Sequence, residues 1–193
     1  MNYQTFIENH LKNSAETKLR IITSCSKNIQ EAVSSIVDCF KQKGKLLICG
    51  NGGSAADAQH IAAEFVIRLS HDIQRPALPA IALTTDTSQL TAGGNDIGFK
   101  NVFARQLQAY GSENDVLLGI STSGNSENII VAAEMAKKLK MKSIGLLGKD
   151  GGKLAKIMDQ NIIVPSDNTQ HIQEGHITIG HIICELVERN LFT

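Results

Sequence analysis

Five short apolar runs, each bounded by glycine or polar residues, constrain this sequence more than any other feature. They lie at residues 46–49, 80–83, 116–120, 143–147 and 162–164. Such runs are typical of strands buried on both faces of a parallel sheet. Helical patterns separate them near residues 54–69, 100–110, 127–140 and 151–157, and a last, long helix is expected from about 169 to 191. We therefore predict an α/β fold with a five-stranded, doubly wound parallel sheet of the flavodoxin-like kind.

The residues before the first apolar run repeat apolar side chains at helical spacing. One series is Phe6, Ile7, Leu11 and Ala15, and another is Ile29, Val33, Ile36, Val37 and Phe40. We predict two leading helices, the second of which Gly44 ends. A length of 193 residues suits one domain. We expect that domain to span residues 1–193, with the helical segment 1–43 also forming an interface.

Charge and cysteine content exclude several classes of protein. The 19 Lys and Arg balance the 19 Asp and Glu, so the chain lacks the basic footprint of a nucleic-acid-binding protein. No run approaches the roughly 18 apolar residues of a membrane helix, and the polar start lacks a signal-peptide core. The four cysteines form no C-x-x-C pair, which fits neither a zinc knuckle nor a disulfide framework. We expect a cytoplasmic protein with reduced cysteines that binds neither nucleic acid nor membranes.

Two similar loops follow the first and third apolar runs, and each leads into a helical pattern. Residues 50–54 read Gly-Asn-Gly-Gly-Ser, and residues 121–126 read Ser-Thr-Ser-Gly-Asn-Ser. Backbone N–H groups at a helix start favour an anion, and the second loop adds hydroxyls. Neither loop has the lysine of a nucleoside triphosphate site, so we predict a single phosphate on a small molecule. The alternative is that both loops are only turns and helix N-caps.

His60 and Glu64 stand four residues apart on the helix predicted after the first loop. Their side chains therefore share one helix face, where they would hold a zinc-type ion or act as an acid–base pair. A surface hydrogen bond between them is the alternative. The last helix holds three of the six histidines of the chain, His171, His176 and His181. His181 has apolar neighbours, so it faces either a buried site or only the core.

Four segments together resemble the sugar isomerase (SIS) domain family: Cys49–Glu64, Gly94–Asp96, Asp115–Ser126 and His171–His181. The resemblance covers nearly the whole chain and is greatest to members that act on a seven-carbon phosphosugar. It implies conversion of sedoheptulose 7-phosphate to D-glycero-D-manno-heptose 7-phosphate, at the start of heptose synthesis for lipopolysaccharide or surface glycans. It also implies a homotetramer with active sites between subunits and one zinc ion per subunit.

The resemblance further implies roles for individual residues. Glu64 and His181 match the catalytic pair, which would move protons through an enediolate. The positions that match zinc ligands are His60, Glu64, Gln173 and His181. The positions that match substrate contacts are Asn51, Gly52, Gly53, Glu64, Asn95, Asp96, Ser121, Thr122, Ser123, Ser126 and Gln173. The family more often has arginine at His171 and a larger apolar residue at Gly175.

The predicted zinc ligands Gln173 and His181 pose a geometric difficulty. They are eight residues apart, about 12 Å along a helix. Both would reach one ion only from opposite ends or from different chains. His176 is the alternative ligand.

Three other functions stay open at this point. A SIS-domain adaptor that binds a replication initiator would lack His60 and Glu64, which this chain has. A nicotinamide-dependent dehydrogenase would use G-x-G-x-x-A at residues 50–55, but the acidic residue expected about 20 residues later is missing. An isomerase of another phosphosugar would share every motif described above.

Overall fold

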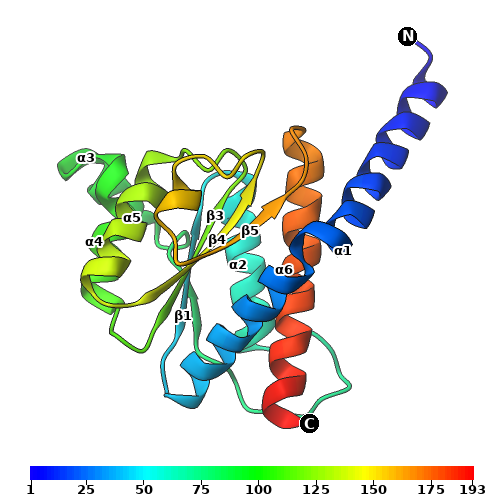
Figure 1. Cartoon of the computed structure of the whole chain (residues 1–193). Coiled ribbons are helices and arrows are strands. Elements are labelled where there is room, and N and C mark those ends of the chain that lie inside the picture. Colours follow the sequence, from blue (N-terminus) through cyan, green and yellow to red (C-terminus); the bar gives the residue numbers. More distant parts are fainter.

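The computed structural model describes all 193 residues and contains the predicted five-stranded sheet (Figure 1). Its strands are β1 (Leu46–Gly50), β2 (Ala80–Ala82), β3 (Val116–Ser121), β4 (Lys142–Gly148) and β5 (Gln160–Val164). All neighbours pair in parallel, in the order β2-β1-β3-β4-β5. This is the flavodoxin-like order. The predicted fold class is confirmed.

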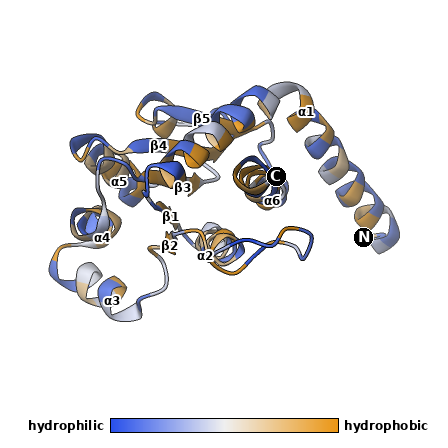
Figure 2. Ribbon diagram, turned by 90° about the horizontal axis from the view of Figure 1, so that it is seen from below, coloured by the Kyte–Doolittle hydropathy of each residue, from blue (hydrophilic) through white to orange (hydrophobic).

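Helices cover both faces of the sheet, as Figure 2 shows from below. The helices on one face are α1 (Tyr3–Lys41), α2 (Gly53–Val66) and α6 (Thr169–Phe192). Those on the other side are α3 (Thr87–Asp96), α4 (Val102–Tyr110) and α5 (Glu127–Lys138). Each face has its own apolar cluster, because the side chains of a buried strand alternate between the two faces. No helix combines the length and hydrophobicity that crossing a membrane requires.

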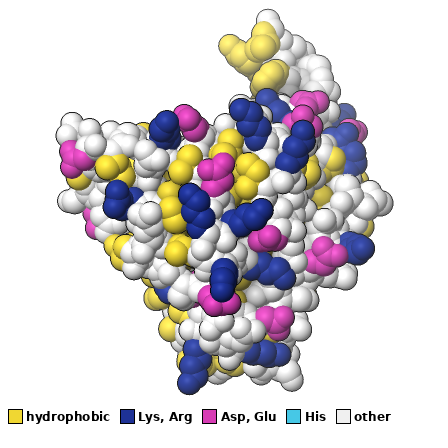
Figure 3. Space-filling model, turned by 60° about the vertical axis from the view of Figure 1, so that its left-hand side comes forward, with side chains coloured by type: hydrophobic (Ala, Val, Ile, Leu, Met, Phe, Trp, Pro, Cys, Tyr) yellow, Lys and Arg dark blue, Asp and Glu magenta, His cyan; other side chains and the backbone are white.

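The prediction of two leading helices is wrong, because α1 is one continuous helix of 39 residues. No glycine or proline interrupts residues 3–41, so nothing in the sequence breaks the helical hydrogen bonds. The helix ends three residues before Gly44, and Lys43 takes a left-handed conformation with φ of 60°. The N-terminal half of α1 projects from the body of the molecule. Hydrophobic side chains gather at its tip (Figure 3).

Two further differences concern the helices of the second half. Helix α3 was not predicted. It buries no residue, so its sequence needs no apolar stripe, and it contains Gly93 and Gly94, which are unusual inside a helix. The helix predicted at 151–157 is only a short 3₁₀ turn, Leu154–Lys156. Gly151 and Gly152 both have positive φ there, 80° and 54°, which no helix accommodates.

The carboxyl ends of the strands meet at the upper edge of the sheet in Figure 1. Helices α2 and α5 begin at this edge, directly after β1 and β3. In an open parallel sheet, ligands bind beyond the carboxyl ends of the strands, where the chain order reverses. Strand β1 lies between β2 and β3, so the reversal falls at β1 and β3. The two predicted phosphate loops therefore lie side by side at this edge.

Candidate active site

In the first loop, at the start of α2, the exposed Gly52 and Gly53 have backbone amides without an acceptor, whereas the Ser54 and Ala55 amides donate to loop carbonyls. Gly52 has φ of 55° and ψ of −121°, and no side chain caps the helix. Uncapped N–H groups at a helix start are an anion site. The Asn51 side chain is engaged in two hydrogen bonds with Asn128 on α5. Each side-chain amide donates to the oxygen of the other, at 2.9 and 2.8 Å. This reciprocal pair fixes the first loop against the helix that follows the second.

The second loop is closed by the hydroxyl of Ser121. That hydroxyl is buried, accepts from the Gly124 amide at 3.1 Å and lies 3.1 Å from the Ser126 hydroxyl. Ser123 accepts from the Asn125 amide at 3.2 Å, and Thr122 is half-buried. Ser121 therefore shapes the loop, whereas the amides and the other hydroxyls line its surface.

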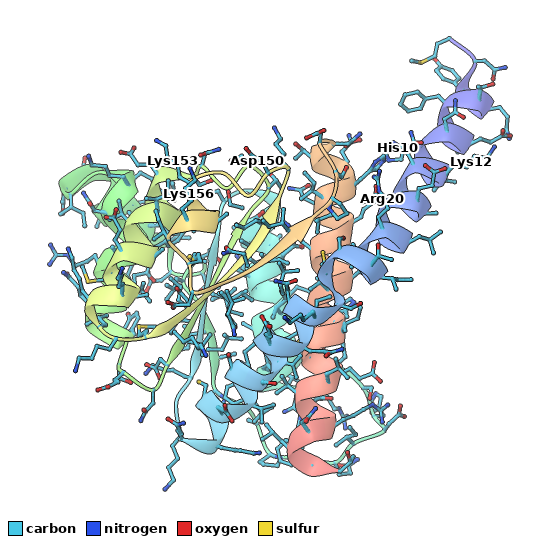
Figure 4. All side chains as sticks on the ribbon, in the orientation of Figure 1. His10, Lys12, Arg20, Asp150, Lys153 and Lys156 are labelled. Carbon is cyan, nitrogen blue, oxygen red and sulfur yellow. The ribbon has the colours of Figure 1, made fainter.

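The loop after β4 forms a wall behind the second loop. The Leu154 amide donates to the Gly124 carbonyl at 3.0 Å, and the Lys153 amide donates to Asn125 Oδ1 at 3.1 Å. The contact is so close that a Cβ on Gly124 would lie 2.0 Å from the Gly151 carbonyl oxygen. Figure 4 shows Asp150 and Lys153 along the same upper edge. Only glycine fits at position 124, which explains the small residue in the serine loop.

His60, Glu64 and His181 come together about two turns below the loops. Nε2 of His60 lies 2.9 Å from Oε1 of Glu64, and Nε2 of His181 lies 3.3 Å from Nε2 of His60. One ligand atom from each residue lies within 4.8 Å of the others. Gly180 permits this approach of α6 to α2, because a Cβ there would lie 2.8 Å from Ile61 Cδ1. The cluster combines the acid–base pair of α2 with a histidine of α6.

The three donors fit a zinc-type ion. Two imidazoles and one carboxylate are a known ligand set of catalytic zinc, which keeps a fourth position open. Two nitrogens bound at about 2.0–2.1 Å on a tetrahedral ion lie about 3.3 Å apart. The two Nε2 atoms already have that separation of 3.3 Å.

Gln173 does not join this cluster within the chain. Its side chain packs on the first loop, where a Cβ on Gly53 would lie 2.5 Å from Gln173 Nε2. It stands eight residues before His181 on α6, about 12 Å along the axis. This position is next to the candidate phosphate site, and its predicted role as a zinc ligand stays a prediction.

His176 is a core residue, so the alternative that it completes the metal site is wrong for this chain. It is fully buried, and its Nε2 lies 2.9 Å from the Leu147 carbonyl oxygen. Burial lowers the pKa of His176 to about 4, against a smaller opposing effect of that hydrogen bond. A neutral imidazole therefore donates to the Leu147 carbonyl of β4, and His176 is not among the residues that cluster with His60.

Asn95 and Asp96 lie far from the cluster in this chain. Both are exposed at the end of α3, where the Asn95 amide donates to Asp96 Oδ1 at 2.7 Å. Figures 1 and 2 both show α3 at the left-hand edge of the molecule, away from α6. A single chain therefore does not bring these two predicted substrate contacts to Glu64.

Asp57, which is not among the predicted site residues, lies one turn before His60 on α2. Its Oδ2 atom is buried without a hydrogen-bond partner. Burial raises the pKa of Asp57, and the nearby His60 lowers it by less. The spacing of Asp57, His60 and Glu64 at i, i+3 and i+7 on one helix face was the available clue.

The sequence profile of the SIS domain matches residues 9–148. The phosphoheptose isomerase of Clostridium acetobutylicum is 52% identical over 191 residues, which cover 98% of this chain and 96% of the relative. The chain belongs to the phosphoheptose isomerases of the SIS domain family. A second relative in that family, from Citrifermentans bemidjiense, is 53% identical over 186 residues, 96% of each chain.

Solved structures of phosphoheptose isomerases agree with this assignment. The enzyme from Francisella tularensis has a TM-score of 0.94 at 40% identity and covers 98% of this chain and 100% of its own. The enzyme from Neisseria gonorrhoeae has a TM-score of 0.91 at 42% identity and covers 97% and 100%. The likeness therefore includes α1 and α6, which the matched SIS profile covers only in part or not at all.

Proposed function

We propose that this protein converts sedoheptulose 7-phosphate to D-glycero-D-manno-heptose 7-phosphate in the cytoplasm, with one zinc ion in each subunit. The observation that carries the proposal is the convergence of His60, Glu64 and His181 beneath two loops suited to a phosphate. Membership in the phosphoheptose isomerase family supports the same substrate. The product would serve heptose synthesis for lipopolysaccharide or surface glycans.

Glu64 is the proposed base, and His181 is its acid partner. Conversion of the ketose to the aldose moves one proton from C1 to C2 and a second proton from O1 to O2. Glu64 would take the carbon-bound proton and return it to the neighbouring carbon. His181, whose Nε2 lies 3.3 Å from that of His60, would exchange the oxygen-bound proton. The two residues come from different helices, so they can address two atoms of one substrate.

His60, Glu64 and His181 would hold the zinc ion. When bound, zinc would polarise the substrate carbonyl and stabilise the charge of an enediolate. Neither Glu64 nor His181 can bind the ion and exchange a proton through the same atom at the same moment, so the two roles of each residue alternate. We assign the proposed fourth donor, Gln173, to the site of a neighbouring subunit, since its amide lies on the first loop of its own chain.

The two loops would bind the phosphate end of the substrate. The amides of Gly52 and Gly53 with the hydroxyls of Thr122, Ser123 and Ser126 form the proposed set, and the buried Ser121 hydroxyl holds the loop that presents them. Fixing the phosphate at a distance from C1 orients the reacting end against Glu64. Asn51 acts in this proposal through the amide pair that it makes with Asn128.

We propose a homotetramer in which each active site lies between subunits. Asn95 and Asp96 are exposed at the end of α3, which lies at the edge of the molecule away from α6, so they would contact the substrate of a neighbour. The projecting α1 offers apolar side chains for the contact, with Phe6 54% and Leu11 63% exposed. In this arrangement residues 1–43 are the interface segment of a single domain that spans residues 1–193.

An isomerase of another phosphosugar is the second candidate function. The motifs of both loops and the cluster would serve a shorter ketose phosphate equally well. Purified protein should be assayed by NMR with sedoheptulose 7-phosphate and with fructose 6-phosphate at equal concentrations. Turnover of the seven-carbon substrate alone supports the proposal, and preference for the six-carbon substrate contradicts it. An adaptor would turn over neither, and a dehydrogenase would change the absorbance of an added nicotinamide cofactor.

A further inference from the structure

Arg75 is a buried arginine in the irregular segment between α2 and β2. Its side chain is 1% exposed, and its ion-pair partner Glu188 on α6 is 2% exposed. Its Nε donates to Glu188 Oε1 at 2.7 Å. Arginine is seldom fully buried unless it is paired, because removing its charge from water costs several kcal/mol. The burial of this arginine therefore calls for a structural or functional explanation.

The other donors of Arg75 bind the last carbonyls of α2. Nη2 donates to the Glu64 carbonyl at 2.7 Å, and Nη1 donates to the Phe65 carbonyl at 2.8 Å. The final carbonyls of a helix have no partner within the helix, and they carry its negative dipole end. The guanidinium therefore caps α2 at the residue that carries the proposed base.

The same guanidinium ties α2 to α6. Glu188 lies seven residues after His181, two helical turns further along α6. One side chain thus connects the backbone of Glu64 to the helix that carries His181. The planar fork of arginine suits this double connection, whereas a lysine ammonium would supply only a point charge.

We propose that Arg75, with Glu188, is a positioning residue that sets the Glu64 carboxylate relative to His181 during isomerisation. The inference rests on the roles proposed above for Glu64 and His181. It does not make Arg75 a substrate contact, because the buried guanidinium is occupied by two carbonyls of α2, by the Pro76 carbonyl and by Glu188. A displacement of the reacting group by about 1 Å costs about 10²-fold in rate.

The double variant Arg75→Met/Glu188→Leu distinguishes an effect of this ion pair on the position of Glu64 from an effect on the stability of the fold. Replacing both members of a buried ion pair with apolar residues is often neutral for stability, so we expect a Tm within about 5 °C of wild type. We expect kcat to fall about 10²-fold and KM to change by less than about threefold, because the phosphate loops are untouched. A kcat within twofold of wild type overturns the proposal.

A single variant keeps the test decisive if the double variant does not fold. Arg75→Lys retains the buried positive charge but cannot bind both carbonyls and Glu188 together. We expect kcat to fall at least tenfold, again with little change in KM. Guanidinium ion at millimolar concentration should partly restore kcat in Arg75→Ala, because it refills the vacated site. An Arg75→Lys kcat within twofold of wild type, or no rescue, overturns the proposal.

A second buried ion pair provides the matched control. Lys45 binds Asp115 at 2.6 Å where the chain enters β1 and β3, and the Asp115 side chain is 1% exposed. Asp115→Ala should lower Tm and leave kcat at a permissive temperature unchanged, which shows that lost stability alone does not slow the reaction. Glu64→Gln is measured in parallel: if that variant is active, the proposed base fails, whereas an inactive Glu64→Gln beside a fully active Arg75→Lys overturns only the positioning role.

Discussion

His60 and His181 are 121 residues apart in the sequence, yet their Nε2 atoms lie 3.3 Å apart. The pairing depends on two helices that run side by side from the same edge of the sheet. Gly180 removes the side chain that would otherwise hold α6 away from Ile61 on α2. Glu64 completes the group from one turn further along α2, 2.9 Å from His60. The fold thus assembles the donor set of a metal site from two separate helices.

Glu64→Gln should abolish turnover while the protein stays folded. The change removes the proposed base but keeps the size of the side chain, and general-base catalysis contributes about 10²–10⁴-fold. We expect kcat at least about 10³-fold below wild type, with a wild-type circular dichroism spectrum. Zinc content should be measured on the same sample, because Glu64 is also a proposed ligand. Substantial activity in Glu64→Gln would refute the assignment of the base.

Ser121→Ala combined with Ser123→Ala should raise KM more than it lowers kcat. If the second loop holds phosphate equally in the ground and transition states, losing its hydroxyls weakens binding uniformly. Replacing Ser121 also removes the hydroxyl to which the Gly124 amide donates at 3.1 Å. Steady-state kinetics check this, with the exposed Ser34→Ala on α1 as a control. A loss confined to kcat would locate these serines at the reacting carbons instead.

His176 should make stability fall under mildly acidic conditions. Burial lowers the pKa of His176 to about 4 in the folded chain, whereas the unfolded imidazole has a pKa of about 6.5. Between these values only the unfolded state binds the proton, so the free energy of unfolding decreases as pH falls through that window. The loss amounts to about 3 kcal/mol.

Urea denaturation of wild type and His176→Gln from pH 7.5 to pH 4.5 tests this. The variant should be less stable at pH 7.5, because it loses the hydrogen bond to the Leu147 carbonyl and leaves a packing defect. Its further loss toward pH 4.5 should be smaller than that of wild type. The exposed His71→Gln is the control. Parallel curves for wild type and His176→Gln would contradict the prediction.

The projecting half of α1 should control both assembly and activity. Phe6→Asp/Leu11→Asp introduces two charges into the proposed interface without touching the core, since both side chains are more than half exposed. We expect light scattering to report a smaller oligomer and the specific activity to fall at least tenfold. Lys12→Asp, on the same helix beside the apolar residues, is the control. A tetramer with full activity in the double variant would exclude this face from the interface.

The sequence predicts the strands well because a strand buried on both faces must be apolar along its length. The run at 46–49 becomes β1 (Leu46–Gly50), for example, with every residue buried. Helix α3 escapes prediction because it buries nothing, and the break expected within α1 fails because no residue there interrupts a helix. A helix that buries nothing has no apolar periodicity to detect, and a gap in the apolar stripe of a long helix does not by itself break that helix.

The sequence likewise predicts some residues of the candidate site and not others. The spacing of His60 and Glu64 lies within one helix turn, so the sequence alone indicates that they converge. The approach of His181 depends on the packing of α6 on α2, which the sequence indicates only through resemblance. Asn128 and Arg75 act through contacts with residues distant in the sequence, Asn51 and Glu188, and no local pattern marks such contacts.

The most direct test is turnover of sedoheptulose 7-phosphate by purified protein before chelation, after chelation, and after zinc is restored. The account predicts that activity is lost with the metal and returns with zinc, in wild type but not in His60→Ala. Full activity in the metal-free protein, or zinc-restored activity in His60→Ala equal to that of wild type, would contradict a catalytic zinc site at His60, Glu64 and His181.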